Sequence, residues 1–119
     1  MITHVVMMKF KPEVCDNDID ELEALLDGLP DKIDEIQSYD FGRDLVGSDR
    51  SYNFALVSVF ANRDTLKHYQ EHPAHQVVVK KLGGMCEHIA VVDYRNAPYR
   101  QQDENEPDPL KRNDLFRRP

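Results

Sequence analysis

The sequence predicts an α+β domain with its elements in the order β-α-β-β-α-β. Two observations lead to this prediction. Four short strand-like stretches alternate with two regions whose apolar residues recur at helical spacing. The chain also has 119 residues, a length typical of one domain. This order is the split βαβ, ferredoxin-like pattern, in which four antiparallel strands carry their helices on one face.

Alternate apolar residues predict a first strand over residues 4–11, and Pro12 ends it. The strand's apolar face holds His4, Val6, Met8 and Phe10. A helix is expected to begin at the acidic residues 16–18, because acids favour a helix N-terminus. Gly28 and Pro30 predict its end. Its apolar stripe consists of Ile19, Leu22, Leu25, Leu26 and Leu29.

The second and third strands are expected over residues 37–42 and 53–60, with a turn over residues 47–51 between them. The third strand is apolar on both faces, which is typical of a strand covered on both sides.

The second helical region is expected to begin at Asn62 or Asp64 and to point Leu66 and Tyr69 inward. Pro73 interrupts the region and suits the first turn of a new helix. Gly83 and Gly84 predict the end of that new helix. A fourth strand follows over residues 87–94.

The helices of such a fold cover only one face of the sheet, and the other face here is also rich in apolar residues. An apolar face of this size indicates an interface. A two-fold arrangement of two identical sheets is the simplest way to cover it. We therefore expect a homodimer that forms through the sheet faces.

The charge balance limits the classes of partner. The chain has 22 Asp and Glu against 15 Lys and Arg, a net charge of −7. This balance argues against nucleic acid and anionic membrane partners. No apolar run approaches the roughly 20 residues of a membrane span, and the N-terminus lacks a signal-peptide pattern. Cys15 and Cys86 lack disulfide or metal-site spacing. We expect a soluble cytoplasmic protein with no metal and no cofactor.

Charge and composition also suggest a domain boundary. Residues 1–94 carry a net charge of −8, whereas residues 95–119 carry +1 and four of the seven prolines. We expect a compact domain over residues 1–94, followed by an extended or disordered tail over 95–119. The alternative is a tail that clasps the partner protomer through its large apolar side chains, Leu110, Leu115 and Phe116.

Five polar residues are the candidates for chemistry. Tyr69, His72 and His75 lie within one irregular helical bend, which can aim side chains into the space between helix and sheet. His4 begins the first strand, and Asp93 lies among apolar residues, where a carboxylate needs a partner such as an imidazole. Each also has a structural interpretation: His72 as a helix cap, Tyr69 as a core residue, and His4 and His75 as hydrogen-bonded structural histidines.

Three segments together resemble the stress-responsive dimeric α/β-barrel (Dabb) family: residues 4–11 (HVVMMKFK), residues 69–75 with the pattern Tyr-x-x-His-Pro-Ala-His, and residues 91–94 (VVDY). The resemblance covers about residues 2–94. It implies a ferredoxin-like protomer that pairs through its sheet into a dimeric α/β barrel.

In one plant member of that family, olivetolic acid cyclase, the catalytic tyrosine and histidine match Tyr69 and His75. The resemblance implies a small organic ligand, with His75 as a base, Tyr69 as a hydrogen-bond donor to an oxyanion, and Asp93 or His4 orienting His75. The resemblance therefore implies aldol-type cyclisation or lyase chemistry. His4, His72, Phe54 and Leu82 are expected to contact the ligand, with Met7 also lining the pocket. The alternatives are a non-catalytic stress-associated or assembly protein with structural histidines, and a dimeric-barrel oxygenase.

Overall fold

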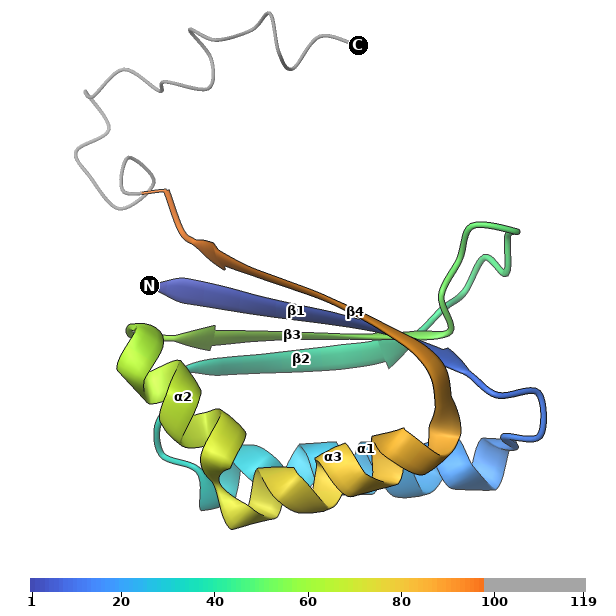
Figure 1. Cartoon of the computed structure of the whole chain (residues 1–119), viewed down its shortest axis with the longest axis horizontal. Coiled ribbons are helices and arrows are strands. Elements are labelled where there is room, and N and C mark those ends of the chain that lie inside the picture. Colours follow the sequence, from blue (N-terminus) through green and yellow to red (C-terminus); the bar gives the residue numbers. More distant parts are fainter. Residues whose placement is uncertain (98–119) are drawn as a thin grey trace, which may run out of the picture.

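One layer of the molecule is a four-stranded antiparallel sheet, and the helices form a second layer on one of its faces (Figure 1). The computed structural model describes residues 1–97. The expected tail from residue 98 onward, with its clasp residues, therefore lies outside the described part. The strands are β1 (Ile2–Phe10), β2 (Ser38–Arg43), β3 (Phe54–Phe60) and β4 (Cys86–Arg95). Their order across the sheet is β2-β3-β1-β4, which confirms the predicted ferredoxin-like pattern.

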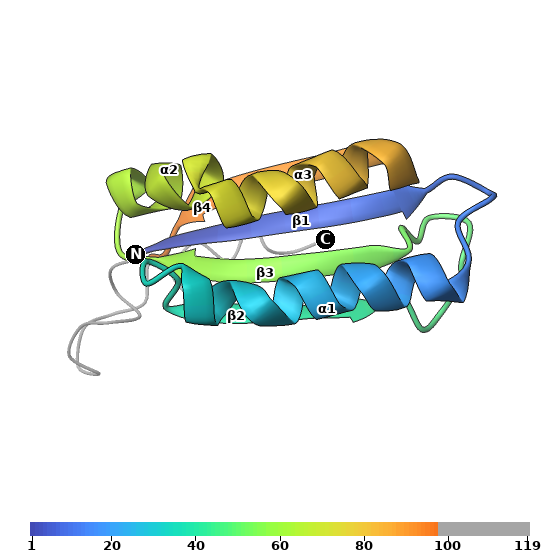
Figure 2. The ribbon, with the colours of Figure 1, turned by 90° about the horizontal axis from the view of Figure 1, so that it is seen from below.

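Three helices cover the sheet, because the second helical region is divided into two. They are α1 (Asp16–Lys32), α2 (Arg63–Glu71) and α3 (Pro73–Met85). Figure 2 shows α1 lying over β2 and β3, while α2 and α3 follow each other over β1 and β4. The break between α2 and α3 falls at His72, directly before Pro73, as the sequence predicts.

Two predicted helix ends are wrong. α1 includes Pro30 and continues to Lys32, closing with a 2.9 Å hydrogen bond from the Ile33 N–H to the Leu29 carbonyl. α3 includes the two glycines at 83 and 84 and continues to Met85. Burial explains both extensions, since Ile33 is 0 % exposed and Met85 is 5 % exposed. Packing of these apolar side chains outweighs the local preference of proline and glycine.

The helix starts follow local hydrogen-bonding rules. Asn62 caps α2, as predicted, by accepting a 2.9 Å hydrogen bond from the Thr65 N–H. α1 begins at Asp16, within the expected range, but its N-cap is Cys15, one residue before that range. The Asp18 carboxylate accepts a 3.0 Å hydrogen bond from the Cys15 N–H.

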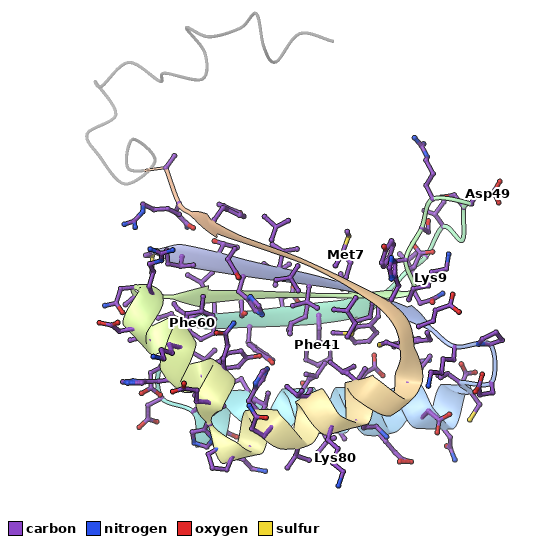
Figure 3. All side chains as sticks on the ribbon, in the orientation of Figure 1. Met7, Lys9, Phe41, Asp49, Phe60 and Lys80 are labelled. Carbon is purple, nitrogen blue, oxygen red and sulfur yellow. The ribbon has the colours of Figure 1, made fainter. Side chains whose placement is uncertain are left out.

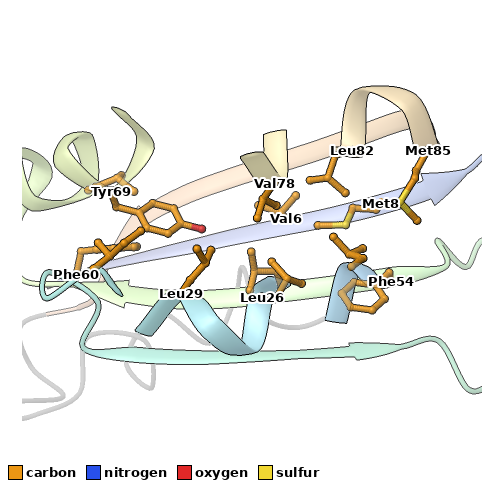
Figure 4. Close-up of a cluster of buried hydrophobic side chains, with 14 of the residues drawn as sticks. Val6, Met8, Leu26, Leu29, Phe54, Phe60, Tyr69, Val78, Leu82 and Met85 are labelled. Carbon is orange, nitrogen blue, oxygen red and sulfur yellow. The ribbon is translucent and has the colours of Figure 1, made fainter. Parts of the chain in front are cut away.

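The core lies between the two layers. The inward face of β1 carries the predicted residues, and Met8 is 0 % exposed. Figure 4 shows the cluster as a row along the sheet, with Tyr69 and Phe60 at one end and Phe54 and Met85 at the other. The core is therefore continuous from the α2 end of the molecule to the α3 end.

The opposite face of the sheet has no helix over it. Val5 on β1 pairs with Val57 on β3 and with Val92 on β4, so all three point to this face. Val57 is 40 % exposed and Val92 is 59 % exposed. Met7 projects from the same face, away from the helices (Figure 3). Among residues 1–97, no helix is long and apolar enough to cross a membrane.

Leu26→Ala should lower the free energy of unfolding by about 3 kcal/mol, because the side chain is completely buried between α1 and the sheet. For a domain of this size, that loss lowers the melting temperature by roughly 15 °C. Thermal unfolding followed by circular dichroism measures the change. Leu45→Ala is the control, since Leu45 is 97 % exposed and should change stability by less than about 0.5 kcal/mol. Equal losses in the two variants would contradict this account of the core.

Candidate active site

A row of polar side chains crosses the inner face of the sheet near the end covered by α2. Asp93 on β4 pairs with His4 on β1, His4 pairs with Ser58 on β3, and Ser58 pairs with Tyr39 on β2. The four residues occupy directly opposed positions, so their side chains emerge on the same face. Within an otherwise apolar layer, this row is the floor of the candidate site.

His4 and Asp93 form the first contact in this row. The Nδ1–H of His4 donates a hydrogen bond to the Asp93 carboxylate. His4 is 5 % exposed, whereas the Asp93 side chain is 38 % exposed and reaches the surface. The donated proton sets the tautomer of His4 when its ring is neutral, leaving Nε2 as the acceptor.

Tyr69 covers the row from α2. Its ring is 0 % exposed and contacts His4 edge-on at a centroid distance of 6.1 Å and Phe60 at 4.8 Å. Its hydroxyl lies 2.9 Å from the hydroxyl of Tyr39. Helical spacing from Leu66 directs Tyr69 inward, as the sequence predicts.

The two phenols differ in their ionisation. Burial raises the pKa of Tyr69 to about 12, although the hydrogen bond with Tyr39 opposes this by lowering it. Burial also raises the pKa of Tyr39, and the neighbouring Tyr69 raises it further. Either hydroxyl can donate the hydrogen bond that joins them, and burial keeps both phenols protonated at neutral pH.

His75 on α3 completes the group. Its ring lies 4.2 Å from the ring of Tyr69, centroid to centroid. Nδ1 lies 3.1 Å from the backbone carbonyl oxygen of Gln70, which only accepts, so Nδ1 carries the proton and Nε2 keeps its lone pair. Burial lowers the pKa of His75 below the ordinary value for histidine, and the neighbouring His4 and His72 lower it further. His75 is accordingly an unprotonated base at neutral pH.

The bend between α2 and α3 produces this geometry. His72 is both the C-cap of α2 and the N-cap of α3. As the N-cap, its Nδ1 accepts a 3.0 Å hydrogen bond from the Ala74 N–H. The chain direction changes at this residue because the position before Pro73 is extended. His72 thus has the capping role that the sequence offered as its structural interpretation.

A hollow of about 700 Å³ adjoins the site between α2 and the edge of the sheet. Asp93, the partner of His4, lies in its wall, and so does Gln70, whose carbonyl holds His75. The remaining lining comes from Ile2, Arg63, Leu66, Lys67, Glu71 and Arg95. The hollow is therefore bordered by the hydrogen-bond partners of both imidazoles, while the rings of His4, Tyr69 and His75 do not line it.

The structure brings together only some of the residues predicted for the site. Tyr69, His75, His4 and Asp93 lie in contact with one another as a group. The hydrogen bond of His75 goes to Gln70, however, and neither Asp93 nor His4 orients it as expected.

Three of the residues expected to line the ligand pocket lie elsewhere: Phe54, Leu82 and Met7. Phe54 and Leu82 are core residues toward the α3 end of the cluster, remote from Tyr69 (Figure 4). Met7 is on the opposite face of the sheet (Figure 3). Alternation along the strand accounts for Met7, because neighbouring residues point to opposite faces.

Sequence reasoning missed Tyr39, Ser58 and Gln70. Ser58 is 0 % exposed, and its hydroxyl has no hydrogen-bond partner among residues 1–97. It was detectable as the single polar residue of an apolar strand. Tyr39 is brought to Tyr69 by strand register, and Gln70 acts through its backbone, so neither carries a local signal. No group of three or more His, Cys, Asp or Glu in the described part of the chain is placed to hold a metal ion.

Comparisons with known proteins agree with this fold. A stress-response A/B barrel domain-containing protein of Arabidopsis thaliana is 27 % identical over 94 residues, which cover 76 % of this chain and 82 % of that protein. A solved dimeric protein of unknown function and ferredoxin-like fold from Bacteroides fragilis is 30 % identical, with a TM-score of 0.71, and covers 79 % of this chain and 94 % of its own.

A hydroxynitrile lyase from Passiflora edulis shares the fold with a TM-score of 0.72 at 21 % identity, over 89 % of this chain and 96 % of its own. Its likeness concerns the fold alone. The model of the stress responsive A/B barrel domain, Dabb, matches residues 2–96. Because this match spans the whole described sheet and its helices, the chain belongs to the stress-responsive A/B barrel (Dabb) family.

Proposed function

We propose that this protein binds a small carbonyl compound and that His75 removes a proton from the carbon next to the carbonyl group. The observation that supports this most directly is the contact between His75 and Tyr69. A histidine with a free Nε2 lone pair lies against a tyrosine that stays protonated at neutral pH. A base and a neutral donor side by side are the two groups that enolisation requires.

The step balances without a cofactor. Nε2 of His75 takes the proton, and the electrons of the broken C–H bond form the enolate, with the negative charge on the carbonyl oxygen. Tyr69 donates its hydroxyl proton as a hydrogen bond to that oxygen. The imidazolium then returns a proton to carbon. Alternatively, the enolate carbon attacks a second carbonyl of the same ligand, and the imidazolium protonates the resulting alkoxide, which completes an aldol closure.

Two further hydroxyls support this assignment. In this proposal Tyr39 donates the hydrogen bond between the two phenols, so that it polarises the Tyr69 hydroxyl and leaves the proton of Tyr69 to the ligand. Ser58 provides an unpartnered hydroxyl on the floor, between the strand positions of His4 and Tyr39, and both of these rings contact Tyr69. Buried polar atoms are normally paired, so this hydroxyl is suited to a ligand oxygen.

The protein is further proposed to act as a homodimer through the helix-free face of the sheet. Exposed apolar residues gather on this face, and the similar protein from Bacteroides fragilis is described as dimeric. A second copy packed against the face would bury these side chains. The dimer would then be the α/β barrel that gives the family its name.

A non-catalytic, stress-associated role is the second candidate. The complete burial of Tyr69 favours it, because a packed core tyrosine needs no ligand. The two candidates differ in what the loss of His75 does: an enzyme loses turnover and keeps its fold, whereas a structural protein loses stability.

Hydrogen–deuterium exchange of the α-protons of cyclohexanone, followed by NMR in D₂O, tests the chemistry. The wild-type protein should accelerate the exchange, and His75→Gln should reduce the acceleration by at least about 100-fold, because the general base is lost. The rate should rise with pH along a sigmoid whose midpoint lies below the ordinary histidine pKa, since burial lowers the pKa of His75 and only the unprotonated ring is a base.

His68→Gln is the matched control, because the His68 side chain on α2 is 65 % exposed and lies 3.6 Å from the Glu35 carboxylate. It should exchange at the wild-type rate. A His75→Gln protein that melts well below the wild type would favour the structural role. Absence of any acceleration by the wild-type protein would contradict enolisation.

Tyr39→Phe tests whether the second phenol acts through the first. Tyr69→Phe should slow exchange by about 100-fold, in the range seen when one oxyanion donor is lost. Tyr39→Phe should slow it by about 10-fold, because Tyr69 keeps its proton but loses the polarising donor. In the double variant the two losses should not add, since Tyr39 has no route to the substrate except Tyr69. Additive losses would show that Tyr39 acts independently.

Val57→Asp should weaken the proposed dimer by at least about 100-fold, because a carboxylate would be buried at the centre of the sheet face. Analytical ultracentrifugation at micromolar concentration measures the dissociation. Val77→Asp is the control, since Val77 is 55 % exposed on α3, away from the sheet. A wild-type protein that sediments as a monomer would contradict the dimer.

A further inference from the structure

We propose that the hollow between α2 and the edge of the sheet binds a carboxylate, so that the substrate is a small organic acid that also carries a carbonyl group. This inference rests on the proposed function of the His75–Tyr69 site and names its substrate class. It concerns three basic residues that the catalytic proposal does not use: Arg63, Lys67 and Arg95.

The three bases approach the hollow from two sides. Arg63 and Lys67 are four residues apart on α2 and so lie on one face of the helix. Arg95 is at the end of β4 and lines the hollow from the sheet. Arg63 and Arg95 also line a second hollow of about 310 Å³, whose lining includes one acid, Asp64.

These bases are not paired with acids. Within residues 1–97, none of the three makes an ion pair, whereas Arg43 alone contacts three carboxylates of α1: Asp16, Asp20 and Glu23. Residues 1–95 contain 17 acids and only 10 bases. A cluster of three unpaired bases therefore opposes the charge of the domain as a whole. Such a local positive field attracts an anion, and a guanidinium matches a carboxylate with two parallel hydrogen bonds.

The two acids of the hollow do not cancel this field at its basic end. Asp93 is hydrogen-bonded to His4. Glu71 ends α2, eight residues beyond Arg63, which corresponds to about 12 Å along the helix. The hollow thus has a basic end at Arg63 and Arg95, and another end at Gln70, whose carbonyl holds His75.

This polarity orients a ligand. A carboxylate at the basic end leaves the rest of the molecule to extend along α2 toward His75 and Tyr69. Ile2 and Leu66, which also line the hollow, provide apolar contact for the carbon chain between the two groups. The site would therefore prefer a keto acid to a neutral ketone of the same size.

The test compares 4-oxopentanoate with its methyl ester, which has the same ketone and no charge. Each is titrated into the full-length ¹⁵N-labelled protein and followed by two-dimensional NMR. The acid should shift the backbone signals of Lys67, Gln70 and Arg95 in a saturable manner, with a dissociation constant at least 10-fold lower than that of the ester.

The double variant Arg63→Gln, Lys67→Gln should bind the acid at least 10-fold more weakly and bind the ester as the wild type does. Lys32→Gln, Lys80→Gln is the matched control, because it removes the same charge from exposed positions outside the hollow. It should bind the acid normally. Figure 3 shows Lys80 pointing away from the sheet.

Equal affinity for acid and ester would overturn the proposal, and so would equal weakening in the two double variants. The cyclohexanone experiment reports separately on the catalytic proposal, because cyclohexanone has no carboxylate. Saturable binding of the acid by a wild-type protein that does not accelerate cyclohexanone exchange supports the carboxylate site while contradicting enolisation. A wild-type protein that accelerates cyclohexanone exchange but binds acid and ester equally well supports enolisation and contradicts the carboxylate site.

Discussion

The candidate site depends on the break in the helical layer at His72 and Pro73. A continuous helix would turn Tyr69 and His75, six residues apart, to different sides of its axis. The extended residue at 72 ends α2, and its imidazole begins α3 by accepting the Ala74 N–H. The carbonyl of Gln70, freed near the end of α2, then accepts a hydrogen bond from His75. One backbone interruption therefore positions the base, orients it and selects its tautomer.

The sequence predicted the parts of this arrangement that local rules govern. Alternation along β1 placed His4 and Met8 inward, and Pro73 marked the break between the helices. Proline and glycine were weaker guides to helix ends, because α1 and α3 continue past them to bury Ile33 and Met85. The apolar contacts of the last helical turn determine where these two helices end, and those contacts depend on the whole fold.

The missed contacts depend on strand register. Tyr39 and Tyr69 are 30 residues apart, and His4 and Asp93 are 89 residues apart. Each pair forms because β2, β3, β1 and β4 align one polar residue per strand. No local sequence pattern predicts that alignment. Ser58, as the single polar residue of β3, indicates only where the polar row crosses this strand. An unpaired buried hydroxyl costs about 1–3 kcal/mol. In our proposal, a ligand oxygen would pair with the Ser58 hydroxyl and offset this cost.

Burial is the largest influence on the protonation of both Tyr69 and His75, and it acts on them in opposite directions. Removal from water disfavours the charged form of any group. For Tyr69 the charged form is the phenolate, so burial raises its pKa to about 12 and keeps the donor proton in place. For His75 the charged form is the imidazolium, so burial lowers its pKa and keeps the lone pair free. At neutral pH the two rings, 4.2 Å apart, are thus a protonated donor and an unprotonated base. Neither state requires a charged neighbour, so a small acidic domain can hold both within one packed layer.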